Sequence, residues 1–342
     1  MIFGLQLAYW QETILKVIGV TLAVLLPAGG YVQVFLFKMM SHMQSRLGPM
    51  EAGPHGSLQL MAEVGKFIQK EDIVPARADK TLFSLAPYLV VGTVLLTYLV
   101  VPFGPDAWFA DLDTGIFFAL AASSISVIGV LIAGWASANK YSLMGGLRAA
   151  GQLIAYELPM VLAVVGVVIQ AGSLNMQDIV HAQANGEIFG FGGLGNPFIL
   201  TQIIGFGIFL MAAQAELTQT PFDMPIAESE LVAGYMTEYS GMRFLLFFIG
   251  EFAATGVFAA IAATLFLGGW WVPGFGIDDN IMNVIGPAVL FGKMMLVAFF
   301  IFWFRFTYPR FREDQLQTLA WKYLIPLSLV NIMATAVLKV VF

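Results

Sequence analysis

Long uninterrupted apolar stretches limit most strongly what this chain can fold into. Several of them approach the ~20 residues that a helix needs to cross the hydrocarbon core of a bilayer. Of the 342 residues, 59% are hydrophobic and only 11% are charged, whereas about a quarter of residues are charged in soluble domains. The sequence therefore predicts an all-α polytopic membrane protein, with residues 1–342 forming a single membrane domain.

Eight apolar segments have the length of a membrane span. They are residues 13–37, 82–101, 115–137, 149–171, 198–215, 243–267, 284–304 and 322–341. We expect eight transmembrane helices connected by structured loops on the cytoplasmic side.

The loops between these segments differ sharply in charge. Thirteen of the sixteen Lys and Arg residues lie on one side of the predicted membrane, at Arg243 and in the loops 38–81, 138–148 and 305–322. The loops on the opposite side contain acids but no Lys or Arg; they are residues 102–114, 172–197 and 268–283. Because basic loops tend to stay in the cytoplasm, both termini are predicted to lie outside.

Residues 57–71 are predicted to form an amphipathic helix within the first basic loop. Apolar residues recur there at helical spacing, with charged residues between them: Leu58, Met61, Val64, Phe67 and Ile68 alternate with Glu63, Lys66 and Lys70. This pattern is typical of a helix that lies on the membrane surface. A solvated linker helix is the alternative.

Residues Gln214–Gly241 carry acids in a setting that normally excludes them. The five acids are Glu216, Asp223, Glu228, Glu230 and Glu238, and the stretch contains no Lys or Arg. Ionisable groups at membrane depth are costly and usually mark ion paths or ligand sites. The stretch is therefore predicted to handle protons or cations. We also expect Asp223 to cap a helix over Met224–Tyr239, with Pro225 in its first turn.

Other sequence features bear on the chemistry. Glu157 falls inside the fourth span and either carries protons or is bonded to Ser or Tyr neighbours. The chain has no Cys, and its three His residues lack metal-ligand spacing, so we expect no metal site and no redox centre. The GFGGLG sequence at 190–195 matches a nucleotide-binding pattern, but no strand precedes it and we interpret it as a flexible loop.

Five motifs on the predicted cytoplasmic side give the chain a resemblance to a known family. They are QSRLGP (44–49), the charged pattern at 62–71, GWAS-x-x-KY (134–141) with its continuation to Arg148, the stretch 215–241 with PFD and ESELVAG, and YPRFR-x-DQL (308–316) within 305–322. In this order they resemble the H subunit of bacterial proton-pumping NADH:quinone oxidoreductase (respiratory complex I). The similarity covers essentially the whole chain.

This resemblance implies a position and a set of partners. The chain would form the membrane part of the quinone chamber, with the quinone tail entering between the first span, the surface helix and the sixth span. Quinone would be the substrate, and FMN and iron–sulfur clusters would lie in partner subunits. The implied partners are the iron–sulfur and quinone-site subunits of the peripheral arm, small and antiporter-like membrane subunits, and the lipid of the bacterial plasma membrane, with no nucleic acid.

The resemblance also implies roles for particular residues. Those that would shape the quinone chamber are Arg46, Lys66, Glu71, Phe222, Asp223 and Arg305. Those that would relay protons are Glu157, Glu216, Glu228 and Glu230, with Glu238 and Glu251 as further candidates. The chain departs from the family pattern at Leu36 and Phe37, where an acid and an Arg are missing, at Gln219, which replaces an Arg, and at Ile226, which replaces a Glu.

Three alternatives remain open from the sequence. The chain could be the homologous membrane subunit of a membrane-bound hydrogenase or of a ferredoxin- or F420-linked complex, although PFD and ESELVAG favour the quinone-reducing branch. An ion-coupled transporter is disfavoured because no inverted repeat relates the two halves. A purely structural scaffold would retain turnover when its acids are changed to amides.

Overall fold

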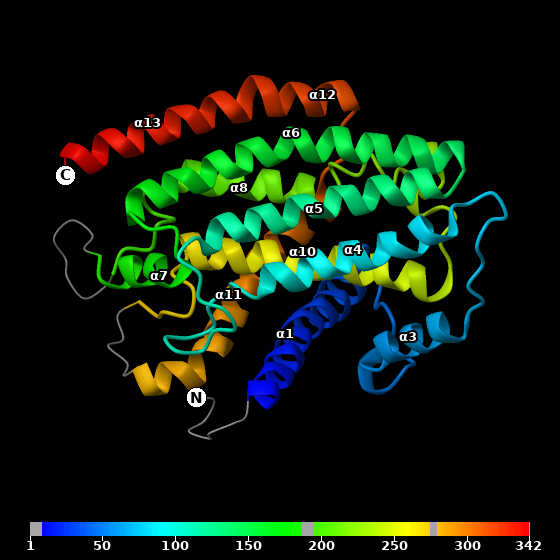
Figure 1. Ribbon diagram of the computed structural model, residues 1–342, viewed down its shortest axis with the longest axis horizontal. Coiled ribbons are helices and arrows are strands. Elements are labelled where there is room, and N and C mark those ends of the chain that lie inside the picture. The colour runs from blue at the N-terminus through cyan, green and yellow to red at the C-terminus, as the bar shows by residue number, and fades with distance from the viewer. Residues whose placement is uncertain (1–8, 187–194, 274–278, 342) are drawn as a thin grey trace.

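The computed structural model describes residues 9–186, 195–273 and 279–341, and all the regular secondary structure in these ranges is helical (Figure 1). The elements are α1 (Tyr9–Tyr31), η1 (Val32–Met39), α2 (Met40–Met43), η2 (Pro54–Gly56), α3 (Gln59–Gln69), α4 (Lys80–Tyr98), α5 (Gly115–Ala136), α6 (Lys140–Ala171), α7 (Met176–Ala184), α8 (Ile203–Glu216), α9 (Glu228–Leu231), η3 (Gly234–Met236), α10 (Gly241–Phe266), α11 (Asp279–Thr307), α12 (Glu313–Thr318), η4 (Leu319–Leu324) and α13 (Ile325–Val341). Most of the GFGGLG sequence lies outside the described residues.

Seven helices in the described ranges are long and apolar enough to cross a bilayer. They are Trp10–Met43, Lys80–Tyr98, Gly115–Ala136, Lys140–Ala171, Gly241–Phe266, Asn280–Thr307 and Glu313–Val340. The predicted span at 198–215 corresponds to α8, an apolar helix of 14 residues, which extends about 21 Å. The prediction of an all-α polytopic membrane protein is confirmed.

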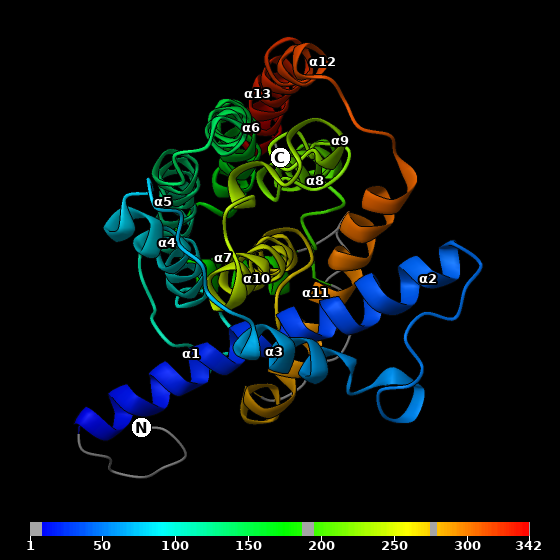
Figure 2. The same ribbon diagram turned by 90° about the vertical axis from the view of Figure 1, so that its right-hand side faces the viewer.

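Helix α10 lies at the centre of the bundle, where α1, α4, α8 and α11 pack against it (Figure 2). Its sequence explains this position, because the buried residues of its second half are mostly small, including Gly256, Ala259, Ala260 and Ala263. Small residues let neighbouring backbones approach closely within a membrane. Helices α1 and α11 run obliquely to the long helices of the bundle (Figure 1).

Helix α3 occupies the position of the predicted amphipathic helix. Its Phe67 ring stacks on Phe244 of α10 with the centroids 5.6 Å apart, while Lys66 and Lys70 are exposed. The helix therefore turns one apolar edge toward the bundle and its lysines toward solvent, as its residue spacing predicts.

Helix α6 begins earlier than the predicted fourth span. The Asn139 side chain accepts a hydrogen bond of 2.9 Å from the backbone N–H of Tyr141, which caps a helix that continues through Pro159 to Ala171. Glu157 therefore lies in the middle of a 32-residue helix and not near its start.

The predicted helix over Met224–Tyr239 is wrong. Only two short elements, α9 and η3, form in this region. Val232, directly after α9, and Gly234, the first residue of η3, adopt positive φ angles of 65° and 53°, which interrupt a right-handed helix. Asp223 does not cap a helix either; its carboxylate pairs with an arginine of the 305–312 segment.

Candidate functional site

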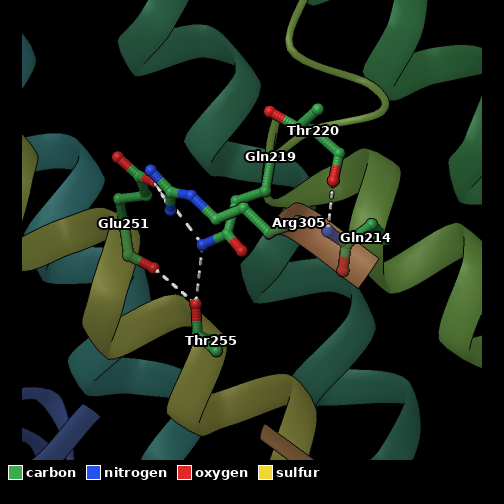
Figure 3. Close-up of polar contacts among 6 residues, drawn as sticks. All are labelled: Gln214, Gln219, Thr220, Glu251, Thr255 and Arg305. Carbon is green, nitrogen blue, oxygen red and sulfur yellow. Dashed lines mark hydrogen bonds and ion pairs between the residues drawn. The ribbon is translucent and has the colours of Figure 1, made fainter. Parts of the chain in front are cut away.

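A partly buried ion pair joins two of the long helices, α10 and α11 (Figure 3). Nη1 of Arg305, in the last turns of α11, lies 3.0 Å from Oε1 of Glu251 in α10, and the two side chains are only 24% and 17% exposed. The Arg305 guanidinium also lies 5.8 Å from the centroid of the Phe252 ring. Each charge compensates the burial of the other, so removal of either one would leave an unpaired buried charge.

Gln219 extends this pair into a small hydrogen-bond network. Its amide Nε2 is 3.4 Å from Glu251 Oε1 and 3.2 Å from Thr255 Oγ1. Gln219 therefore offers Glu251 a neutral amide donor beside the cation of Arg305. In this network the guanidinium of Arg305 donates a hydrogen bond to the carboxylate of Glu251 (Figure 3).

A second ion pair lies close to the first. Arg310 Nη2 is 2.9 Å from Asp223 Oδ2, and Arg310 Nη1 donates to Ser229 Oγ at 3.2 Å. Burial raises the pKa of the Asp223 carboxyl above its usual value; Arg310 and then Arg305 oppose this, while Glu251 adds to it. The two pairs therefore form one charge cluster of Asp223, Glu251, Arg305 and Arg310.

Glu216 of α8 and Glu157 of α6 form a second group of acids, separate from the charge cluster. Glu216 ends α8, and its buried Oε2 has no hydrogen-bond partner among the described residues. Glu157 accepts a hydrogen bond from Ser124 of α5, and the two carboxyl groups interact electrostatically. Two acids that lie together at membrane depth in this way are typical of ion and proton paths.

The remaining acids of the stretch lie outside these two groups. Glu228 is exposed. Glu230 pairs with Arg148 of α6 at 2.6 Å, with 46% of its side chain exposed. Glu238 accepts a hydrogen bond from the Asn139 side chain. Glu228 and Glu230 thus lie on the surface of the loop, while Glu238 is half-buried.

Phe222 is fixed by helix α6. Gln152 Nε2 donates 2.7 Å hydrogen bonds to the backbone oxygens of both Ala215 and Phe222. The Phe222 ring lies between Tyr156 and Phe311, at centroid distances of 5.1 and 5.6 Å. These contacts hold the chain next to Asp223 in place.

An apolar groove of about 120 Å³ lies between α1, α3 and α10. Its walls include Ala28 and Val32 from the first span, Val64 from α3, and Phe252 from α10, and Glu63 is the one charged residue among the described residues that line it. Phe252 belongs to both the groove and the ion-pair region, because Arg305 lies over its ring. The groove therefore ends beside the charge cluster.

The other three predicted chamber residues are exposed. Arg46 Nε donates to the Gln44 side chain at 2.8 Å, and Lys66 Nζ lies 5.0 Å from the Phe67 ring centroid. The backbone oxygen of Glu71 accepts a hydrogen bond from Ser240. The structure thus brings Asp223 and Arg305 together but leaves Arg46, Lys66 and Glu71 on the surface.

Several residues of the site were not predicted as such. Arg310, Gln152 and Thr255 gave no signal beyond their residue type, because their partners are distant in sequence. Tyr235 is also part of the surroundings: burial, and then the charges of Glu251 and Asp223, raise its pKa, so that its phenol stays protonated. In the described ranges, no group of three His, Asp or Glu side chains is arranged to hold a metal ion.

The fold and the site together define a class of protein: a polytopic helical membrane protein with a partly buried charge cluster beside an apolar groove. The family model described as NADH dehydrogenase matches residues 15–336, and the chain belongs to this family. The resemblance inferred from the motifs is confirmed.

Curated relatives cover nearly the full length of the chain. It is 47% identical over 326 residues to an H subunit of NADH-quinone oxidoreductase from Syntrophobacter fumaroxidans, covering 92% of each chain. It is 45% identical over 334 residues to the H subunit of the same enzyme from Brevibacillus brevis, covering 97% of this chain and 95% of the relative. The H subunit from Bacillus thuringiensis is 46% identical over 307 residues, covering 89% of this chain and 87% of the relative.

Proposed function

We propose that this chain is the H-type membrane subunit of a proton-translocating NADH:quinone oxidoreductase. In this role it forms the membrane part of the quinone chamber and couples quinone reduction to proton transfer. The observation that carries the proposal is the apolar groove of α1, α3 and α10, which ends at the ring of Phe252 beside the Glu251–Arg305 pair.

The groove suits the isoprenoid tail of a quinone. Its lining is almost wholly aliphatic and aromatic, and it opens between a membrane span and the surface helix α3. An apolar tail gains free energy when it leaves water for such a surface. A substrate dissolved in the bilayer could therefore reach the charge cluster without crossing the aqueous phase.

The charge cluster suits the reacting end of the substrate. Reduction of a quinone to a quinol takes up electrons and protons together, and negative charge develops on the quinone oxygens before they are protonated. A fixed cation near that charge stabilises it. Arg305 supplies such a cation, because it lies over the Phe252 ring at the end of the groove, and its burial is already compensated by Glu251.

The acids beyond the cluster would link quinone reduction to proton transfer away from the groove. Gln219 bonds to Glu251, and Glu216 lies three residues earlier in the chain. Glu216 in turn interacts with Glu157 in the middle of α6. A change of charge at the cluster can therefore reach the deeper acids over a short path, which we propose as the start of proton coupling.

The surface at this end of the bundle would contact the partner subunits. Arg46, Lys66, Glu71, Glu228 and Glu230 are exposed there, and we propose that subunits of the peripheral arm, which carry the FMN and the iron–sulfur clusters, cover them. With the basic loops on the cytoplasmic side, both termini would lie outside the bacterial plasma membrane.

Replacing Val64 with tryptophan tests the tail groove. The larger ring would fill the space between α3 and α10, and overpacking of this kind costs about 1–3 kcal/mol. We expect the KM for a quinone with a long isoprenoid tail to rise about tenfold, with a smaller rise for a short-tailed analogue, in membranes that contain the assembled complex.

Val34→Trp is the matched control, because Val34 is 45% exposed and does not line the groove. Equal effects of Val64→Trp on long- and short-tailed quinones, or equal effects of the two variants, would contradict the proposed path of the tail.

A further inference from the structure

A second and larger groove lies along the N-terminal half of α1, next to the part of the helix that lines the smaller groove. It has a volume of about 710 Å³ and is formed by α1 and α4, with Ile125 of α5 at its floor. None of the described residues that line it also lines the smaller groove. Its volume falls within the ~300–1,000 Å³ typical of sites for small molecules.

The position of this groove matches one leaflet of a bilayer. Along α4 it extends from Tyr88 to Leu99, which is about 16 Å at the helical rise of 1.5 Å per residue. Half of a ~30 Å hydrocarbon core has nearly the same length. Leu99 directly follows the end of α4, on the side of the predicted outer loops, so the groove occupies the outer half of the membrane.

The wall of the groove is apolar over most of this length. Val17 and Val20 face Leu89, Leu95 and Leu96 across it. Gly92 also lines the groove, and a Cβ built on it meets no atom within 4 Å. The missing side chain at Gly92 thus leaves open space at the middle of the groove, where an acyl chain would lie.

The outer end of the groove carries a pair of opposite charges. Glu12 Oε1 and Lys16 Nζ are 3.1 Å apart, one helical turn from each other, and are 38% and 35% exposed. Lys16 Nζ also lies 5.9 Å from the ring centroid of Trp108, in the loop that follows α4. Trp and Lys are residues typical of the interface between hydrocarbon and headgroups.

We propose that this groove binds one phospholipid of the outer leaflet whose headgroup is a zwitterion with a primary ammonium, of the phosphatidylethanolamine type. The acyl chain lies along Gly92, the lipid phosphate bonds to Lys16, and the lipid ammonium bonds to Glu12. A pair of opposite charges complements a headgroup that itself carries both signs, whereas an anionic headgroup would be repelled by Glu12. The lipid would seal α1 against α4 along residues 12–21 and leave the part of the span that lines the tail groove free.

The test uses the purified complete complex in nanodiscs that contain trace photoreactive phosphatidylethanolamine, with the photoreactive group on an acyl chain. We expect labelled peptides from 13–21 and 88–99. Gly92→Leu, whose Cβ would meet no atom within 4 Å and whose side chain would occupy the groove, should lower this labelling about tenfold. Gly292→Leu is the matched control, because a Cβ added at Gly292 also meets open space but this residue lies in α11.

The headgroup assignment is tested with the same probe and with an anionic phosphatidylglycerol probe. Glu12→Gln should remove the preference for the ethanolamine headgroup, because the ammonium loses its anionic partner and the anionic lipid is no longer repelled. Lys16→Gln should weaken labelling by both probes about tenfold.

Two results would overturn the proposal. One is labelling of the groove that is equal for both probes in the wild-type complex. The other is crosslinking of a photoreactive residue at position 92 to another subunit, which would show that a protein helix covers the groove. Because the readout is labelling and not turnover, it is independent of the fate of the quinone-chamber proposal.

Discussion

Membranes carrying Arg305→Leu are expected to lose nearly all NADH:quinone turnover. The change removes the cation that lies over Phe252 at the end of the tail groove, and Glu251 loses its charge partner while it keeps the Gln219 amide. Breaking a partly buried pair leaves Glu251 without its compensating charge, and the loss of one stabilising donor at a reaction site lowers the rate by about 10²–10³. NADH oxidation by an artificial electron acceptor that bypasses quinone measures the activity of the rest of the complex. We expect this activity to be retained.

The Arg312–Asp314 pair supplies the control for this change. It lies on the same segment at 2.7 Å, but its side chains are 77% and 64% exposed. Exposed pairs contribute little, so Arg312→Leu should leave turnover close to that of the wild type. Turnover of the assembled Arg305→Leu complex at the level of Arg312→Leu would remove Arg305 from the reaction.

Replacing Gly234 with valine is expected to prevent assembly of the subunit. Gly234 has a φ of 53°, and a Cβ there would lie 1.7 Å from the backbone oxygen of Pro225. That contact is with backbone and cannot be relieved by a rotamer change, and the β-branched residue also disfavours positive φ. We expect a loss of several kcal/mol, at the upper end of the ~0.5–3 kcal/mol seen for most substitutions, and little subunit in the complex on a native gel.

Gly151→Ala is the paired control. Gly151 lies within α6, and a Cβ there meets no atom within 4 Å. Alanine in a helix is favoured over glycine by about 1 kcal/mol, so this variant should assemble normally or with higher thermal stability. Normal amounts of assembled Gly234→Val complex would show that the loop between α9 and η3 is not packed as described.

The fold was predictable because its determinants are local in sequence. The apolar runs that predict spans are the same residues that form α4, α5, α10 and α11, and the spacing at 57–71 predicted α3. The acidic stretch failed as a helix prediction because its conformation depends on distant groups. Within Met224–Tyr239, Glu230 pairs with Arg148 of α6 and the Tyr239 hydroxyl donates to the backbone oxygen of Phe83 in α4, and helix propensity cannot report such contacts.

The acidic residues of the site could be predicted from the sequence, but the ion pairs that they form could not. Glu251 and Arg305 were both candidates, yet they are 54 positions apart and the sequence placed them in different roles. Arg310 stood out only as one of several basic residues near the end of α11. For Glu157 the two open readings are not exclusive, since it bonds to Ser124 and also interacts with Glu216.

The central claim is that quinone reduction at the charge cluster is coupled to protons through the acids of this subunit, and Glu216→Gln tests it most directly. Glutamine keeps the shape of the side chain but cannot carry a proton. Glu313→Gln, at the exposed start of α12, provides the control. The measurement is NADH:quinone turnover and proton pumping in membranes whose complex is shown to be intact on a native gel. The account predicts that both activities are lost in the Glu216→Gln complex and kept in the control. Unchanged turnover and pumping in a fully assembled Glu216→Gln complex would contradict it and move the coupling role to Glu157.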